Sequence, residues 1–199
     1  MKSKYLLCLI CAALMLTGCS SILSSQKDTD YMQTGETGII SIGNCLEINN
    51  TNSSLTLLDN KDVLSSDGLY YAAWVTGNVR PYENSDGDTI DLYDAQLYLL
   101  LEEFTGSEKA QANLDTWIDT ERSTYEITGE EDIICNGQPY TLLRYNCINE
   151  DNPYAHGISA FGICGTTAVC FELTCVEDFE EDPQTILTGF LEDCTYSAE

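Results

Sequence analysis

Tight turns between short apolar runs in the second half of the chain limit the folds that it can adopt. Asn136-Gly137 separates Ile133-Ile134 from the run at 140–145, and Gly165-Thr166-Thr167 separates the runs at 158–163 and 168–173. An Asn-Gly pair favours the two-residue turns that join paired strands. Strands joined this closely have to run antiparallel. The sequence therefore predicts an antiparallel sheet at the centre of the fold.

Earlier segments predict more strands. The runs 40–44, 55–58 and 69–75 are rich in apolar, β-branched and aromatic residues. Polar residues at 49–53 and the pair Asp67-Gly68 separate these runs, as expected for loops and turns. A short run at 125–127 precedes Ile133-Ile134. We expect an opening meander that leads into the later hairpins.

Two helices are predicted between these groups of strands. From Asp88 to Phe104 apolar residues recur at spacings of three and four, and Asp88 or Asp91 provides an anion near the predicted N-terminus. A second helix is predicted from Ser107, as its cap, to about Arg122. Its apolar stripe consists of Ala110, Leu114, Trp117 and Ile118.

A third helix is predicted at the end of the chain, over residues 183–194. Asp182 is placed to cap it, and Pro183 takes the first helical position. Ile186, Leu187, Phe190, Leu191 and Cys194 form its apolar face. We expect this helix to dock on the sheet, giving an α+β fold in which an antiparallel sheet packs against helices.

The order of these elements resembles that of the PsbP-like sandwich. The similarity rests on the turn 136–139 before Tyr140-Thr141-Leu142-Leu143, and on Ile186-Leu187 followed by Phe190-Leu191, and it spans about residues 38–196. The resemblance implies a binding or accessory domain without known catalytic residues. Fold alone does not determine function.

The N-terminus resembles a bacterial lipoprotein signal. Lys2 and Lys4 precede an apolar segment that is shorter than the roughly 20 residues of a membrane-spanning helix. Leu16-Thr17-Gly18-Cys19 is similar to the lipobox, which implies acylation of Cys19 and cleavage after Gly18. An ordinary secretory signal with an incidental cysteine is the alternative. The expected location is the extracytoplasmic face of the cell membrane, through a lipid anchor.

The predicted organisation therefore has three parts: a lipoprotein signal peptide at 1–18, a flexible tether at 19–37, and one α+β domain at 38–199. The tether is predicted from its Ser, Thr, Gly and Asp content, which gives too little apolar surface to offset ordering. The remaining chain is long enough for one domain with its own core.

The charge of the chain excludes some partners. The sequence has 8 basic and 33 acidic side chains, and loss of Lys2 and Lys4 with the signal leaves a net charge of −27. A domain this acidic is repelled by nucleic acids and by anionic lipid head groups. We therefore expect no nucleic-acid partner, and contact with the membrane only through the lipid anchor. The acidic surface serves either solubility or the recruitment of basic peptides.

Seven cysteines remain after Cys8 and Cys11 leave with the signal and Cys19 is acylated. An odd number leaves at least one unpaired within the molecule. Four of them are the candidates for disulfides or free thiols: Cys164 and Cys170, which flank a hairpin turn, and Cys175 and Cys194, which end the last strand and the last helix. Partial disulfide formation and small buried thiols both stay open.

No motif for a metal, cofactor or catalytic site is found in the sequence. The cysteine spacings of five and more do not suit zinc, and a calcium loop centred on Gly87 places Tyr82 and Tyr93 where carboxylates are required. The single histidine, His156, is interpreted as a surface group at the start of a strand. The acidic run 177–182 is interpreted as a solvated loop that caps the last helix.

Three functional classes remain. A binding or accessory domain with a protein or peptide partner is the preferred interpretation, since many tyrosines are available to form a contact surface. A hydrolase that uses acidic residues and a structural envelope protein are the alternatives. Two facing carboxylates in a cleft would favour the hydrolase.

The lipid anchor leads to a direct prediction. Cys19→Ala removes the acylated sulfur, so the variant is expected in the soluble fraction while the native chain sediments with membranes. Cell fractionation followed by immunoblotting measures this. Continued membrane retention of a processed variant would contradict the anchor.

Overall fold

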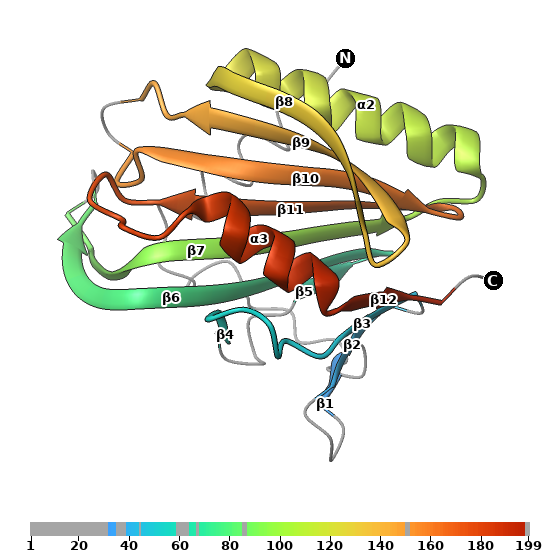
Figure 1. Ribbon diagram of the computed structural model, residues 1–199, viewed down its shortest axis with the longest axis horizontal. Helices are drawn as coiled ribbons and strands as arrows, with labels where there is room; N and C mark the ends of the chain where they lie inside the picture. The colour runs from blue at the N-terminus through green and yellow to red at the C-terminus, as the bar shows by residue number, and fades with distance from the viewer. Residues whose placement is uncertain are drawn as a thin grey trace.

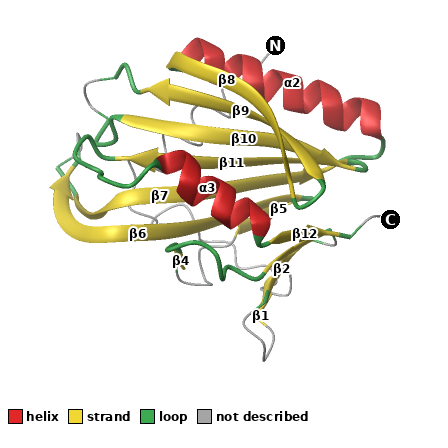
Figure 2. Ribbon diagram, viewed as in Figure 1, coloured by secondary structure: helices red, strands yellow, loops and turns green. Residues whose placement is uncertain are grey.

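The computed structural model describes residues 32–34, 39–43, 45–58, 64–66, 68–84, 87–149 and 152–197. The predicted signal peptide, the lipobox with Cys19 and most of the predicted tether lie outside these residues. Among the described residues there are two helices, and strands make up most of the rest (Figure 2).

A small sheet brings both ends of the described chain together. Its strand order is β1 (Met32–Thr34), β2 (Ile40–Ile42), β3 (Leu46–Ile48) and β12 (Cys194–Tyr196), with antiparallel pairing throughout. Strand β1 lies within the segment predicted as tether. Next to β12, the carboxylate of Asp193 accepts hydrogen bonds from the backbone N–H groups of Thr51 and Asn52.

A larger antiparallel sheet of eight strands forms the centre of the protein (Figure 1). Its order is β4-β6-β7-β11-β10-β9-β8, and β5 also pairs with β6. The strands are β4 (Thr56–Leu57), β5 (Leu64–Ser66), β6 (Leu69–Glu83), β7 (Thr89–Glu103), β8 (Glu126–Cys135), β9 (Gln138–Asn146), β10 (His156–Cys164) and β11 (Thr167–Cys175). The predicted antiparallel sheet is confirmed.

The two predicted hairpins of the second half are confirmed. Cys135 pairs with Gln138 around Asn136-Gly137, and both turn residues have positive φ, 48° and 81°. Cys164 pairs with Thr167 around the second turn. Asn and Gly tolerate positive φ better than other residues, which explains how this dipeptide sets the turn.

The predicted helix between Asp88 and Phe104 is wrong, since this segment is strand β7. Ala95, Leu97, Leu99 and Leu101 alternate on one face of β7, and Leu100 is buried on the other face. A central strand that is covered on both faces carries apolar residues on both, which imitates helical spacing. Asp88 and Asp91 therefore lie in the β6–β7 turn and on β7, and neither begins a helix.

Helix α2 (Ser107–Thr124) agrees with the second predicted helix, except at its start. Gly106 is the N-cap and makes no side-chain cap bond, so Ser107 is the first helical residue and the predicted serine cap is wrong. The stripe of Ala110, Leu114 and Trp117 is buried, as predicted. Glu121 continues this buried stripe one turn further.

Helix α3 (Pro183–Glu192) confirms the third predicted helix and its capping. The Asp182 carboxylate accepts hydrogen bonds from the backbone N–H groups of Gln184 and Thr185, and Pro183 begins the helix. Phe190 packs edge-on against Trp74 of β6 and Phe171 of β11, at ring-centroid distances of 4.9 and 5.9 Å. The predicted docking of this helix on the sheet is also confirmed. Cys194, however, belongs to β12.

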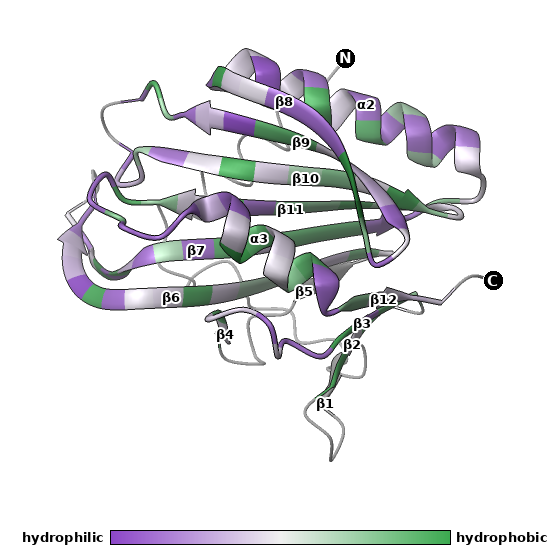
Figure 3. Ribbon diagram, viewed as in Figure 1, coloured by the Kyte–Doolittle hydropathy of each residue, from purple (hydrophilic) through white to green (hydrophobic). Residues whose placement is uncertain are grey.

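The two helices cover opposite faces of the large sheet. One core joins α3 and the small sheet to residues such as Trp74, Leu97 and Phe171, while a second joins α2 to Leu100, Leu143 and Phe161. Hydrophobic colour concentrates along the central strands in Figure 3. The label α+β fits only roughly, because sheet predominates over helix.

The cap of α3 leads to a stability prediction. Asp182→Ala removes the acceptor for two backbone N–H groups and is expected to lower the free energy of unfolding by about 1 kcal/mol at pH 7. Hydrogen bonds from Thr185 lower the pKa of Asp182 from its ordinary 3.8. The cap is therefore fully effective above pH 3.8, and its contribution is lost as pH falls through the lowered pKa.

Urea denaturation of both proteins at several pH values measures this difference. Glu181→Ala is the control, because Glu181 is exposed and adjacent but does not cap the helix. An equal loss in the two variants would contradict the assigned role.

Candidate functional site

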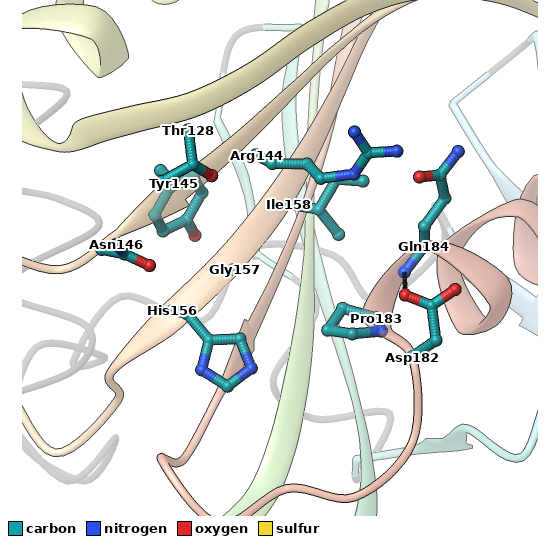
Figure 4. Close-up of a pocket in the computed structure, with 10 residues that line it drawn as sticks. All are labelled: Thr128, Arg144, Tyr145, Asn146, His156, Gly157, Ile158, Asp182, Pro183 and Gln184. Atoms are coloured by element: carbon teal, nitrogen blue, oxygen red, sulfur yellow. Dashed lines mark hydrogen bonds between the residues drawn. The ribbon is translucent and has the colours of Figure 1, made fainter.

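A surface pocket of about 170 Å³ lies between the N-terminus of α3 and the strands β8, β9 and β10. Each of these elements contributes polar side chains to its wall, as Figure 4 shows. The lining residues are Thr128, Arg144, Tyr145, Asn146, His156, Gly157, Ile158, Asp182, Pro183 and Gln184. The pocket is therefore assembled from segments that are distant in sequence.

Glu131 connects three of the elements that surround the pocket. Its Oε1 accepts a hydrogen bond from Arg144 Nη2 at 2.7 Å and from Gln184 Nε2 at 2.9 Å. This bonding links β8 and β9 to the first turn of α3. Arg144 and Glu131 are both near 40 % exposed, so their ion pair contributes at most about 1 kcal/mol to stability. Its main effect is to orient Arg144 at the pocket.

His156 and Asp182 lie at different walls of the pocket. His156 begins β10 and is half-buried, while Asp182 precedes α3 and is exposed. In Figure 4 the His156 ring lies across the pocket from Pro183. The hydrogen bonds from Thr185 hold the pKa of Asp182 below its ordinary value, and Arg144 adds to this effect. Asp182 is therefore an ionised helix cap.

A second cluster, under α2, contains two buried carboxyl groups. Glu121 of α2 is 8 % exposed and Glu172 of β11 is 6 % exposed. Burial, followed by the negative charge of Glu172, raises the pKa of Glu121 well above its ordinary value of 4.5, while Ser159 has a smaller opposite effect. Glu121 is accordingly the member of the pair that retains a proton.

Two tyrosines hold Glu172 in place. The hydroxyls of Tyr125 and Tyr145 both donate to Glu172 Oε1, at 3.1 and 3.0 Å. Their rings stack at a centroid distance of 4.1 Å with an interplanar angle of 8°. Gly157 makes room for this arrangement, because a Cβ at this position would lie 2.4 Å from the Tyr145 hydroxyl.

The sequence contains a signal for this carboxyl cluster, although the apolar patterns did not predict it. Glu121 falls on the apolar stripe of α2, four residues after Trp117, and Glu172 interrupts the apolar run of β11. A charged residue at a core position of each element is unusual unless it has partners. Their proximity required the tertiary structure.

The four candidate cysteines do not form two facing pairs. Cys164 pairs with Thr167 and Cys170 pairs with Phe161, so three register positions separate the two cysteines and they face opposite sides of the sheet. Cys175 pairs with His156 at the pocket end of α3, whereas Cys194 follows the other end of that helix. All seven cysteines in the described residues are free thiols.

The buried thiols are poorly suited to reaction. Burial raises the pKa of Cys175 to about 12 and of Cys45 to about 11. The thiolate is the reactive form, so these thiols behave as small core residues at neutral pH.

The remaining sequence interpretations concern the acidic segment before α3, metal binding and membrane-spanning helices. The acidic segment before α3 is exposed apart from Phe179, and it ends in the Asp182 cap, as predicted. In the described parts of the chain, no cluster of three or more His, Cys, Asp or Glu side chains is arranged to hold a metal ion. No helix among these residues is long and apolar enough to cross a membrane.

The fold defines an antiparallel-sheet domain with helices on both faces, and comparisons with known proteins add structural neighbours. No family model matches the chain, and no curated protein matches its sequence. Among solved structures the chain is similar to cyanobacterial PsbP (CyanoP) from Synechocystis sp. PCC 6803, determined in solution. The identity is 16%, the match covers 73% of this chain and 94% of that chain, and the TM-score is 0.39.

The tyrosine cluster leads to a second stability prediction. Tyr145→Phe removes one of the donors to the buried Glu172 oxygen, and we expect the free energy of unfolding to fall by about 1.5–3 kcal/mol. Urea denaturation at pH 7 measures the loss. Tyr93→Phe, on β7 outside the cluster, is the control and should change stability by less than about 0.5 kcal/mol. Equal losses of unfolding free energy in the two variants would contradict a stabilising role for the hydrogen bond from Tyr145 to Glu172.

Proposed function

We propose that the chain is a lipid-anchored extracytoplasmic binding domain, which contacts its protein partner at the pocket beside α3. The observation that carries this proposal is the pocket itself, where polar side chains from β8, β9, β10 and the start of α3 converge. Convergent polar groups in a concave surface are typical of ligand sites. The predicted anchor at Cys19 would hold this pocket outside the membrane.

The size of the pocket indicates what kind of ligand it takes. Its volume of about 170 Å³ is smaller than the roughly 300–1,000 Å³ of sites for drug-sized molecules and cofactors. One side chain or the end of a peptide fits such a space. We therefore infer a partner protein that inserts a single residue and is contacted further by the surrounding surface.

The chemistry of the pocket favours a polar residue of the partner. Arg144 supplies donors, and the amides of Asn146 and Gln184 supply both donors and acceptors. Outside the pocket the domain is strongly acidic, with 33 Asp and Glu residues in the sequence. A partner with a basic surface would associate faster with such a domain because their electrostatic potentials are complementary.

The alternatives find less support. A hydrolase that uses two carboxylates requires them in a cleft that substrate reaches. The facing carboxyl pair in the described residues, Glu121 and Glu172, is buried under α2, and Asp182 at the pocket is occupied in capping α3. A purely structural envelope role gives no reason for the polar pocket.

Site-specific photo-crosslinking tests the proposed contact. A photoreactive residue at Thr128, which is exposed and lines the pocket, is expected to capture a discrete partner in intact cells. The matched control is Ile134, which is 75% exposed on the same strand but does not line the pocket. The product should form at position 128 and be weak or missing at 134. Equal products at both positions, or none at 128, would contradict the proposal.

A further inference from the structure

We propose that the buried pair of Glu121 and Glu172 holds a single proton, on Glu121, which keeps α2 docked on the sheet, so that α2 is released locally as pH rises. The two carboxyl groups lie between α2 and β11, under a helix whose other buried residues are apolar. This inference concerns conformation and goes beyond the proposed function, although Tyr145 also lines the pocket beside α3.

The first step is the charge state of Glu172. Two phenol hydroxyls donate to one of its oxygens, Oε1, at 3.0 and 3.1 Å. Hydrogen bonds donated to a carboxylate favour its ionised form. The stacked pair of Tyr125 and Tyr145 is therefore built to hold a negative charge at Glu172.

The second step is the state of Glu121. Its Oε1 is buried and has no hydrogen-bond partner among the described residues. A second ionised carboxyl beside Glu172 in this dry location would be costly, because two like charges would be buried together. A proton on Glu121 removes this cost, and burial and the Glu172 charge both raise its pKa.

The titratable groups that the described residues place around the pair are carboxyls, phenols and thiols, which carry no positive charge. The titratable groups on this side of the sheet include Tyr125 after α2, Tyr145 of β9, Cys147 after β9, Cys170 of β11, and Tyr98 of β7, which pairs with Glu172. Glu102 of β7 lies here too, and accepts a hydrogen bond from Asn113 of α2 at 3.0 Å. Strand β10 contributes Ser159. The nearby cation, Arg122 of α2, already forms an ion pair with Glu130 of β8 at 2.7 Å, and both of these side chains are exposed. Ionisation of Glu121 therefore produces an uncompensated charge under the helix.

The direction of the pH effect follows from linkage. The docked state binds one more proton than the released state between pH 4.5, the ordinary pKa of Glu121, and its raised pKa. Docking is then strongest below pH 4.5 and weakens as pH rises through this window, by up to about tenfold in the equilibrium constant per pH unit. Above the raised pKa the dependence disappears.

Release of α2 has a local structural consequence. Leu114 and Trp117 leave the second core, and their partners Leu143 and Phe161 on the sheet lose their cover. The core under α3 does not include α2, so it can persist when the helix is released.

Hydrogen exchange with mass spectrometry on the full chain tests the proposal. Protection factors of residues 107–124, corrected for intrinsic exchange, are expected to fall by up to about tenfold per pH unit above pH 4.5, while those of β10 and β11 change little. Glu121→Gln mimics the protonated carboxyl, so it should keep α2 protected and remove the slope. Glu108→Gln is the matched control, since Glu108 is exposed on the same helix and should leave the slope unchanged.

Three results would overturn the proposal: a native α2 whose protection is independent of pH, a slope that survives Glu121→Gln, or equal losses in α2 and the central strands. A ¹³C carboxyl titration of the native chain gives a measurement that needs no variant. It should find one glutamate that stays protonated well above pH 4.5, and the absence of such a glutamate would also refute the proposed proton on Glu121.

Discussion

Burial of the central strands on both faces is the constraint on which the rest of the structure depends. Strands β7, β10 and β11 present one row of apolar side chains to α3 and another to α2. Neither face is stable in water alone, since the buried apolar area is the main stabilising contribution to folding. The small sheet and α3 therefore cover one face, while α2 covers the other. The pocket lies where this covering ends, at the first turn of α3.

The second face is not uniformly apolar, and this exception changes its behaviour. Glu172 of β11 lies buried under α2, and Glu121 lies near it on the helix. Two tyrosines stabilise the carboxylate by donating hydrogen bonds to its Oε1. Replacing buried ionisable groups by apolar residues of similar volume is often neutral or stabilising, so the fold itself does not require a carboxyl pair here. The polar pair makes the attachment of α2 conditional on protonation, whereas α3 is attached by aromatic packing that does not titrate.

Local signals in the sequence predict much of this fold. The Asn136-Gly137 turn and the Asp182-Pro183 helix start are correct because their chemistry is local and acts within a few residues. The helix predicted over residues 88–104 is wrong, because spacing alone does not distinguish a helix from a strand that is buried on both faces. The pocket had no local signal: Thr128, Arg144, His156 and Asp182 come from four elements and form no motif. The same holds for Glu121 and Glu172, which lie far apart in sequence and meet only when α2 packs on β11.

The pairing of β3 with β12 has a consequence for how the chain reaches its final state. Leu46–Ile48 pairs with Cys194–Tyr196, so strands from near the two ends of the described chain lie side by side. During synthesis from the N-terminus, β3 has no partner in β12 until residues 194–196 have been made. Contacts of such high sequence separation form slowly, because a long loop has to close before they stabilise anything. The β8–β11 hairpins can assemble earlier from neighbouring segments, so closing the small sheet is expected to be a late step in folding.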